Sequence, residues 1–429
     1  MNILYLAHRI PYPPNKGDKL RAFRQIERLS REHRVWCVCF VDRPGDFQYV
    51  EDLRRHCAEV IAVELRPRTA TLRGAASLLF GGMVTTGYYA CGAMREQLRQ
   101  LKRRVRFDAI VAFSSSMARY ARMVPARRRI LDLCDCDSQK WLAYADRHAG
   151  PMRRLHALEG RRLARMERAC LNEFDAAIVI TDSEAATLAP FAPPGRLHVV
   201  GNGVHLPDDR LLERDKHRFP PIVGFVGVMD YWPNVDAVKW FVEECWPAIR
   251  QAHPAAVFRI VGRCPTRGVR RLAKTPGVQV VGEVDDVGWE VRRFDVSVAP
   301  LRIARGLQNK VLEAMAYAKP IVLTTGAAEG IIGRSGEHFL TADSPQAFIQ
   351  HVRILLDNQA ERERLGAAAR SLVAARYRWD DVLDAFDRIV TSTAVGWSWG
   401  RPRREVGCFQ STIVNRHSPQ PRPILQTVP

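Results

Sequence analysis

Short apolar runs recur along the chain, and most are followed by a polar turn and then by a segment with helical spacing. At the start, residues 2–7 form an apolar run, residues 14–19 a polar turn, and residues 20–31 carry apolar side chains at helical intervals. The run predicts a strand, and the spacing after it predicts a helix. This order is typical of a doubly wound parallel α/β unit, where ligands gather at the carboxyl ends of the strands.

The same alternation continues to about residue 390. Further strands are predicted at 35–41, 60–65, 107–113, 130–134, 176–181 and 197–200, and then at 222–226, 257–261, 278–281, 296–299 and 321–324. Further helices are predicted at 94–104, as an exposed pair within 138–173, at 184–188 with Ser183 as N-cap, and at 234–250, 309–318, 346–356, 361–375 and 379–390. Because the second half repeats the opening scheme, the pattern predicts two Rossmann-like domains facing a central cleft, with a hinge at 201–204.

A chain of 429 residues with 47% hydrophobic residues is long enough for two cores. We expect a first domain over residues 1–205, with an insert at about 66–106, and a second over residues 206–376. Residues 210–221 are charged and contain Pro, which predicts a linker. A C-terminal helix is expected within 377–396. Residues 397–429 have no apolar period, so we expect a disordered tail.

The net charge of +19 is concentrated in the first half. Residues 1–200 hold 34 Lys and Arg against 21 Asp and Glu, a net +13. Anionic lipid, nucleic acid or an acidic acceptor could complement this charge. Nucleic acid is disfavoured because no aromatic residues alternate with the basic ones and no known module is present. The ten cysteines include no CxxC pair, and the short apolar run at residues 2–7 is not expected to act as a secretory signal; both features predict a reducing cytoplasm.

Residues 74–94 carry no charge and are long enough to span a bilayer. Their five glycines, two threonines and two tyrosines make the hydropathy weak. Basic residues flank the segment at 66–73 and 99–106. A membrane-contacting loop or helix pair and a plain buried insertion are both preferred to a transmembrane span.

The stretch at 306–322 combines a glycine turn, a short helix and a strand. A helix that begins under a glycine turn presents free N–H groups and a positive dipole end, which suit a phosphate. Lys310 and Glu313 are three residues apart and therefore share a face at that end. The cation could meet a diphosphate, and the carboxylate could accept hydrogen bonds from a ribose. The alternative is an ordinary core helix with a salt-bridged face.

These residues resemble a known family. The run EAMAYAKPIV after Leu312, the hinge Asn202-Gly203-Val204 and the repeated strand–Gly–loop pattern resemble family-4 retaining glycosyltransferases of the GT-B fold. Four longer runs resemble the sugar transferases associated with exosortase (PEP-CTERM) exopolysaccharide systems: PYPPNKGDKLR, CDCDSQKW, GVMDYWPNVDAV and PLRIARGLQNKVLEAMA. The likeness covers most of residues 1–390.

The resemblance implies a nucleotide-diphosphate sugar held mainly by the second domain and an acceptor held by the first. It implies transfer with retention and without a required metal or cofactor. It assigns the ribose to Glu313 and the diphosphate to Lys310 and the backbone near Gln308 and Asn309. Gly17 would let the first-domain loop approach the diphosphate. Gly227 would line the donor cleft, and the loop after residue 282 would lie by the base.

The chain departs from the broad family at two places. Arg305 stands where the family has an earlier glutamate, and arginine donates hydrogen bonds but cannot accept them. Arg302 and Arg305 are therefore candidates for a phosphate or a sugar carboxylate. Residues 228–232 lack the Arg and Lys that the family commonly has there. Lys310 and Arg305 would then supply the positive charge that stabilises the leaving group.

Asp135 and Asp137 form a DxD after a predicted first-domain strand. Hydrogen bonding to an acceptor or sugar is favoured over metal binding, which would need such oxygen ligands, and over a structural cap. His8 ends the first strand, where a lone histidine is more often structural. Asp285 and Asp286 indicate a loop cap, with recognition of the base as the alternative.

We therefore predict a cytoplasmic glycosyltransferase, peripheral at the inner membrane, that uses a nucleotide-sugar donor and a saccharide or lipid-linked acceptor. Its product would belong to an exopolysaccharide or cell-surface glycan. A nucleotide-sugar epimerase on the same fold, or a basic membrane- or nucleic-acid-binding protein, are the alternatives. The predicted catalytic residues are Asp135, Asp137, Lys310 and Glu313. The predicted donor-binding residues are Gly17, Gly227, Arg263, Asp285, Arg302, Arg305, Gln308, Asn309, Lys310 and Glu313. The predicted acceptor or membrane contacts are Lys19, Arg66, Arg68, Arg73 and Tyr88, with no metal ligand.

Overall fold

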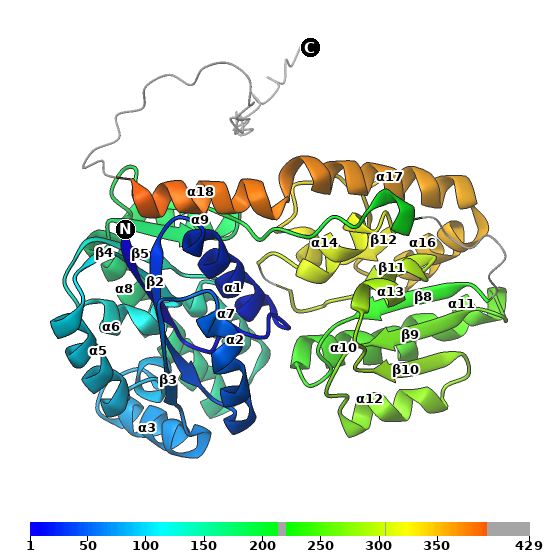
Figure 1. Cartoon of the computed structure of the whole chain (residues 1–429). Helices are drawn as coiled ribbons and strands as arrows, with labels where there is room; N and C mark the ends of the chain where they lie inside the picture. The colour runs from blue at the N-terminus through cyan, green and yellow to red at the C-terminus, as the bar shows by residue number, and fades with distance from the viewer. Residues whose placement is uncertain (213–219, 305, 393–429) are drawn as a thin grey trace, which may run out of the picture. The chain divides into compact units, whose positions relative to one another are not determined.

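The structure is a computed structural model that describes residues 1–212, 220–304 and 306–392 (Figure 1). Residues 1–392 form one compact unit, and Arg305 and the tail predicted at 397–429 lie outside the described residues. The described part contains two separate parallel sheets. The predicted α/β class with two Rossmann-like folds is confirmed, while the domain boundaries stay predictions.

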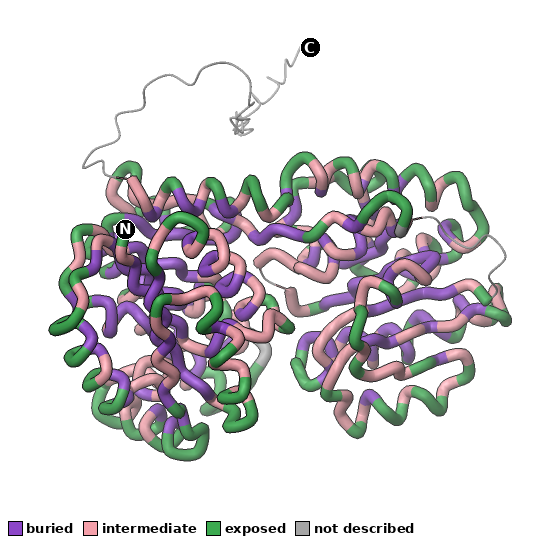
Figure 2. Tube along the Cα trace, in the orientation of Figure 1, coloured by how far each residue is buried: buried purple, intermediate pink, exposed green. Residues whose placement is uncertain are grey.

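The first sheet has seven parallel strands in the order β3-β2-β1-β4-β5-β6-β7. Its strands are β1 (Asn2–Ala7), β2 (Arg34–Val41), β3 (Glu59–Glu64), β4 (Phe107–Phe113), β5 (Ala126–Asp132), β6 (Ala176–Val179) and β7 (Leu197–Val199). The helices of this half are α1 (Gly17–Ser30), α2 (Val50–Arg54), α3 (Pro67–Leu79), α4 (Val84–Tyr88), α5 (Gly92–Arg104), α6 (Ala118–Ala121), α7 (Asp137–Arg147), α8 (Gly150–Glu173) and α9 (Asp182–Leu188). The central strands are buried on both faces, as their continuous apolar sequences require (Figure 2).

The second sheet has six parallel strands in the order β10-β9-β8-β11-β12-β13. Its strands are β8 (Ile222–Val226), β9 (Val257–Val261), β10 (Val278–Gly282), β11 (Val296–Ala299), β12 (Ile321–Leu323) and β13 (Leu340–Thr341). The helices are α10 (Trp232–Trp240), α11 (Trp246–Ala252), α12 (Arg267–Arg271), α13 (Val287–Arg292), α14 (Asn309–Ala316), α15 (Thr325–Ala328), α16 (Pro345–Asp357), α17 (Gln359–Arg376) and α18 (Trp379–Thr391).

The uncharged segment at 74–94 forms the end of α3, all of α4 and the start of α5. It is held against α8 by hydrogen bonds. The buried Glu159 carboxylate accepts from the backbone N–H groups of Val84 and Thr85 at 2.8 and 2.9 Å, and Arg162 donates to the carbonyl of Gly82 at 2.5 Å. Among the described residues, no helix has the length and apolar character needed to cross a membrane.

Two predicted helix boundaries are wrong for local reasons. The helix predicted at 234–250 begins earlier, at Trp232, and is divided by a π-helical turn over Phe241–Cys245, after which α11 begins at Trp246 with Pro247 in its first turn. The N-cap of α9 is Thr181 and not Ser183. Its side chain accepts from the Glu184 N–H, and the Glu184 carboxylate accepts from the Thr181 N–H, which completes a capping box.

The last helix, α18, packs on the first sheet although it follows the second half in sequence (Figure 1). Phe386 and Val390 are fully buried in the core that contains α1 and β1. Arg28 of α1 forms an ion pair with Asp387 at 3.1 Å. The chain therefore begins and ends its described part in the same half.

Candidate active site

The start of α14 lies beside the carboxyl end of β8, and its first residues are fixed by close contacts. The Lys310 ammonium donates to Asn234 Oδ1 and lies 4.6 Å from the centre of the Phe225 ring. A Cβ on Gly227 would be 2.7 Å from Asn234 Nδ2 and 3.1 Å from Lys310 Nζ. A larger residue at position 227 would therefore have to displace the Asn234 amide and crowd the Lys310 ammonium.

Glu313 follows Lys310 on the same face of α14 and is half-buried. Among the described residues, none forms a hydrogen bond or an ion pair with its carboxylate. Burial lowers the pKa of Lys310 to about 7, and the charge of Glu313 only partly offsets this. Burial likewise raises the pKa of Glu313 to about 7, against the effect of Lys310. The Lys310 ammonium and the Glu313 carboxylate are poorly solvated and lack a full set of hydrogen-bond partners. Such a pair indicates a binding site for a polar ligand.

These shifts predict how donor binding should depend on pH. Lys310 carries its charge below about pH 7, and Glu313 carries its charge above about pH 7. If the cation binds a diphosphate and the carboxylate binds a ribose, affinity should peak near pH 7 and fall on both sides, by up to about tenfold per pH unit. Titration calorimetry with a nucleotide-sugar checks this. Lys310→Met should flatten the alkaline side and Glu313→Gln the acid side; a pH-independent affinity in the native protein would contradict it.

The N-termini of α1 and α14 meet at Gly17 and Asn309. A Cβ on Gly17 would lie 3.0 Å from Asn309 Nδ2, so a larger residue would displace that amide. α1 has 14 residues and α14 has eight. The free N–H groups and positive dipole ends of both helices therefore point toward one region, which favours an anion.

Two basic side chains add to this region. Arg263 follows β9, and its Nε and Nη2 atoms are buried without a hydrogen-bond partner among the described residues. Lys16 precedes α1, and its pKa is lowered by burial first and then by the positive charges of Arg9, Arg43 and Arg263. Cations that repel one another and lack partners are stabilised by a bound anion. Arg263 was predicted from the sequence, and Lys16 was not.

A buried polar network, also not predicted, connects the first sheet with the start of α14. Asp132 at the end of β5 accepts from Arg21 Nε at 3.0 Å and from Gln25 Nε2 at 2.7 Å. Arg21 also donates to Asn202 Oδ1 at 3.1 Å, and Asn202 Nδ2 donates to Asn309 Oδ1 at 3.0 Å. The predicted hinge residue Asn202 thus positions the first residue of α14.

The DxD aspartates have different surroundings. Asp137 accepts from Ser115 Oγ at 2.7 Å. Asp135 points into a pocket, and its pKa is raised to about 7 by burial first and then by the charge of Glu184. The carboxyl is open to the water of the pocket, which limits this effect. Among the described residues, the group with metal-type ligand spacing is Glu32, His33 and Asp387, where α1 and α18 meet; metal independence stays a prediction.

Several side chains that were predicted to bind the donor, the acceptor or the membrane contact other protein groups or lie outside the pocket. Arg302 forms an ion pair with Asp236 on α10 and does not line the pocket. Lys19 is 5% exposed and pairs with Asp46 at 2.8 Å, so its ammonium does not reach a surface. Asp285 is exposed on the loop before α13, while Asp286 accepts from the Trp289 N–H at 3.0 Å, as expected of a cap.

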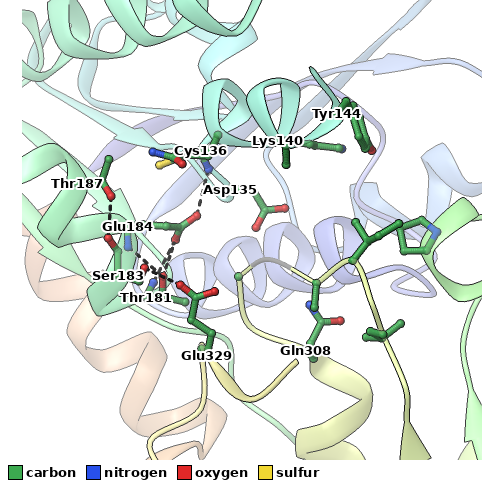
Figure 3. Close-up of a pocket in the computed structure, with 18 of the residues that line it drawn as sticks. Asp135, Cys136, Lys140, Tyr144, Thr181, Ser183, Glu184, Thr187, Gln308 and Glu329 are labelled. Carbon is green, nitrogen blue, oxygen red and sulfur yellow. Dashed lines mark hydrogen bonds between the residues drawn. The ribbon is translucent and has the colours of Figure 1, made fainter. Parts of the chain in front are cut away.

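The pocket lies between the strand ends of the two sheets and, with its open mouth included, holds about 1010 Å³. Figure 3 shows the Asp135 carboxyl between Lys140 and Gln308, with Glu184 and Ser183 on one side and Glu329 below them. Its described lining residues are Asp135, Cys136, Gln139, Lys140, Ala143, Tyr144, Thr181, Ser183, Glu184, Thr187, Tyr231, Pro233, Asn234, Leu301, Ile303, Ala304, Gly306, Gln308, Glu329 and Gly330. Both halves of the chain therefore build it.

Each half of the chain matches a known protein family. Residues 20–203 match the family described as glycosyl transferase 4-like domain, and residues 220–358 match the family described as glycosyl transferases group 1. Each half of the chain therefore matches a glycosyltransferase family. These matches agree with the family-4 resemblance, whereas nothing in the comparisons bears on the exosortase subgroup.

Among curated glycosyltransferases, the phosphatidyl-myo-inositol mannosyltransferase of Propionibacterium freudenreichii subsp. shermanii is 27% identical over 225 residues. The match covers 49% of this chain and 54% of that protein, about half of its length. Two solved structures resemble this chain. Anabaena HepE in complex with UDP and glucose has a TM-score of 0.65 at 14% identity, with 91% of this chain and 100% of that chain covered. Sucrose-phosphate synthase from Thermosynechococcus elongatus has a TM-score of 0.69 at 17% identity, with 91% and 98% covered. These similarities identify the fold as GT-B.

Proposed function

We propose that the protein is a retaining glycosyltransferase that moves a sugar from a nucleotide-diphosphate sugar to a hydroxyl group of a saccharide or lipid-linked acceptor. The observation that carries the proposal is the start of α14. Lys310 and Glu313 are half-buried there without a full set of partners, opposite the Gly17 turn. A nucleoside diphosphate offers the ribose hydroxyls and the anionic groups that these side chains need.

In this proposal the donor is held by its two polar parts. The Glu313 carboxylate accepts hydrogen bonds from both ribose hydroxyls, and Lys310 and the first N–H groups of α14 bind the diphosphate. Arg263 and Lys16 supply further positive charge, and Arg263 compensates for the missing basic residues at 228–232. Preorganised cations in a site closed to water stabilise the charge that develops on the departing phosphate.

The proposed reaction breaks the bond between the anomeric carbon and the diphosphate oxygen and forms a bond from that carbon to the acceptor oxygen. Retention places the acceptor hydroxyl on the face of the leaving group, so a phosphate oxygen takes the hydroxyl proton. Asp135 accepts a hydrogen bond from a neighbouring hydroxyl of the acceptor and so orients the attacking one. These steps need no metal or other cofactor, because the side chains above provide the charge.

The relatives support the two substrate classes. HepE was solved with UDP and glucose, which fits a nucleotide-sugar donor. The curated relative is by name a mannosyltransferase of phosphatidyl-myo-inositol, a lipid acceptor. The matched region is only about half of that relative. Its acceptor therefore suggests the class of acceptor that this chain uses, a lipid, but not the particular lipid.

A donor screen tests the proposed function. UDP-, GDP-, ADP- and dTDP-sugars are each incubated with the full chain, with and without a membrane extract, and release of the nucleoside diphosphate is measured. We expect turnover with one nucleotide class, and stabilisation of the protein by the same nucleotide because the ligand binds the native state. If no nucleotide-sugar is turned over and no nucleotide stabilises the protein, the proposal that it is a glycosyltransferase is wrong. Conversion of the donor to its epimer without transfer would favour the epimerase alternative.

We further propose that the edge formed by α3 contacts an anionic membrane, which would place the enzyme at the cytoplasmic face of the inner membrane, in exopolysaccharide or surface-glycan synthesis. Leu72, Leu79 and Phe80 are 70, 83 and 89% exposed. Arg66 and Arg68 are exposed at the start of the same helix, whereas Arg73 turns inward and donates to the Tyr88 carbonyl at 3.4 Å. A helix with exposed arginines at its start and exposed apolar side chains along its length and at its end, on a hairpin fixed to α8, offers both charge and apolar surface for interfacial binding.

Replacing Leu79 and Phe80 together with serine should weaken binding to vesicles of phosphatidylglycerol and phosphatidylethanolamine by at least about tenfold, because each large apolar side chain contributes roughly 1.5–3 kcal/mol when buried. Both side chains are exposed, so folding should not change. Co-sedimentation measures the binding. Ile354→Ser, an exposed apolar residue on α16, is the matched control; equal loss in both variants would refute the α3 surface.

A further inference from the structure

The pocket in Figure 3 has a composition that differs from that of the phosphate region around Lys310. Its walls carry hydroxyl, amide and carboxyl groups, from Gln139, Ser183, Thr187, Gln308 and Glu329. Hydroxyl and amide groups both donate and accept hydrogen bonds, and carboxylates accept them. Such a lining fits a ligand with many hydroxyl groups.

Two aromatic rings add an apolar element. Tyr144 on α7 and Tyr231 before α10 both line the pocket, and Tyr231 is 48% exposed. A tyrosine presents an apolar body with a polar tip. A pyranose ring combines an apolar C–H face with a rim of hydroxyls, so rings and polar groups together match one sugar.

The described lining residues of the pocket carry more acidic than basic side chains, unlike the residues around Lys310. Among the described lining residues, Asp135, Glu184 and Glu329 are acidic and Lys140 is the single Lys or Arg. A phosphate or a uronate placed among these carboxylates would meet like charges in a partly buried space, where repulsion is less screened than in water. A neutral sugar meets no such cost.

The pocket borders the proposed donor site. A Cβ on Gly306 would be 3.0 Å from Asp135 Oδ1, which shows how closely the loop before α14 approaches the aspartate. Gln308 both precedes the first residue of α14 and lines the pocket. A sugar in the pocket would therefore lie against the loop that leads into the donor-binding helix.

We infer that this pocket binds the reacting end of the acceptor as a neutral saccharide, through the Tyr144 and Tyr231 rings and hydrogen bonds to Ser183, Thr187 and Glu329. The inference rests on the proposed function and narrows it. A lipid-linked acceptor fits only if a neutral sugar, and not the lipid phosphate, enters the pocket. Ser183 Oγ already donates to Glu329 Oε1 at 3.0 Å, so these two groups are oriented together from opposite halves of the chain.

Saturation-transfer NMR on the full chain, with the nucleoside diphosphate that stabilises it most, tests the inference. The probes are methyl glycosides of glucose, galactose and mannose, with methyl glucuronide and glycerol phosphate as anionic counterparts. We expect saturation transfer to at least one neutral glycoside and none to the anionic probes. Equal or stronger transfer to an anionic probe, or none to any neutral glycoside, would overturn it.

Variants locate the binding. Glu329→Gln and Tyr144→Ala should each weaken the neutral glycoside by about tenfold, the change expected for one lost hydrogen bond to a charged group or one lost stacking contact. Ser183→Ala serves as a second, smaller change should Tyr144→Ala fail to fold. Glu96→Gln, an exposed glutamate on α5 outside the pocket, is the control and should change nothing. Unchanged affinity in the pocket variants would place the sugar elsewhere. If the nucleotide still stabilises the protein in that case, the pocket assignment fails alone and the proposed function stands.

Discussion

Replacing Glu313 with alanine should lower the affinity for the nucleotide-sugar by about a hundredfold or more. A carboxylate that accepts two ribose hydrogen bonds contributes roughly 1.5–3 kcal/mol per bond, and about 1.4 kcal/mol corresponds to a tenfold change in affinity. The fold should be retained. Glu313 has no hydrogen-bond partner among the described residues, and its burial disfavours the charged form, so alanine removes an unfavourable term rather than a contact.

Titration calorimetry measures this change, and the melting temperature of the free protein reports on folding. Glu363→Ala, at an exposed position on α17, is the matched control and should leave affinity unchanged. A 2′-deoxyribose donor keeps one of the two hydroxyls, so it should bind the native protein more weakly than the ribose donor does and should lose less affinity in the variant. If Glu313→Ala and native protein bind the ribose donor equally, the ribose role is wrong.

Replacing Lys310 with methionine should reduce kcat by about a hundredfold to a thousandfold. The expected size is that of removing one preorganised group that stabilises developing charge. Methionine keeps the length of the side chain and can pack on the Phe225 ring where the Lys310 stem and ammonium now lie. It also removes a cation whose pKa burial has lowered, so folding should not suffer.

Initial rates of transfer or donor hydrolysis under saturating donor separate this effect from weaker binding. Lys274→Met, at an exposed position after α12, is the control. A normal kcat with a raised KM would show that Lys310 binds the donor without assisting departure of the phosphate. A normal kcat with a normal KM would remove Lys310 from the site.

The fold was predictable because parallel strands covered on both faces are continuous apolar runs, which stand out against helical spacing. Boundaries were less predictable. The run at 176–181 hid the Thr181 cap, and nothing in the local pattern shows the π-helical turn before Pro247. The apolar stripe of α18 predicts that a sheet covers it, but not that the first sheet does so.

Some residues of the candidate site could likewise be predicted from the sequence, and others could not. Lys310 and Glu313 could be paired from the sequence because residues three apart share a helix face. The network from Asp132 through Arg21 and Asn202 could not, since Arg21 and Asn202 are 181 positions apart in the chain and no periodicity joins them. Lys16 could not be assigned for a similar reason, because two of the three cations that lower its pKa, Arg43 and Arg263, are distant in sequence.

The return of α18 to the first sheet constrains how this enzyme can be recombined with its relatives. A chimera that takes the whole C-terminal portion from another protein would also replace Phe386 and Val390, which belong to the core of the first half. The foreign helix would have to fit a surface with which it did not evolve. Donor specificity should therefore transfer between relatives only when the exchanged block ends before Trp379 and the recipient keeps its own final helix.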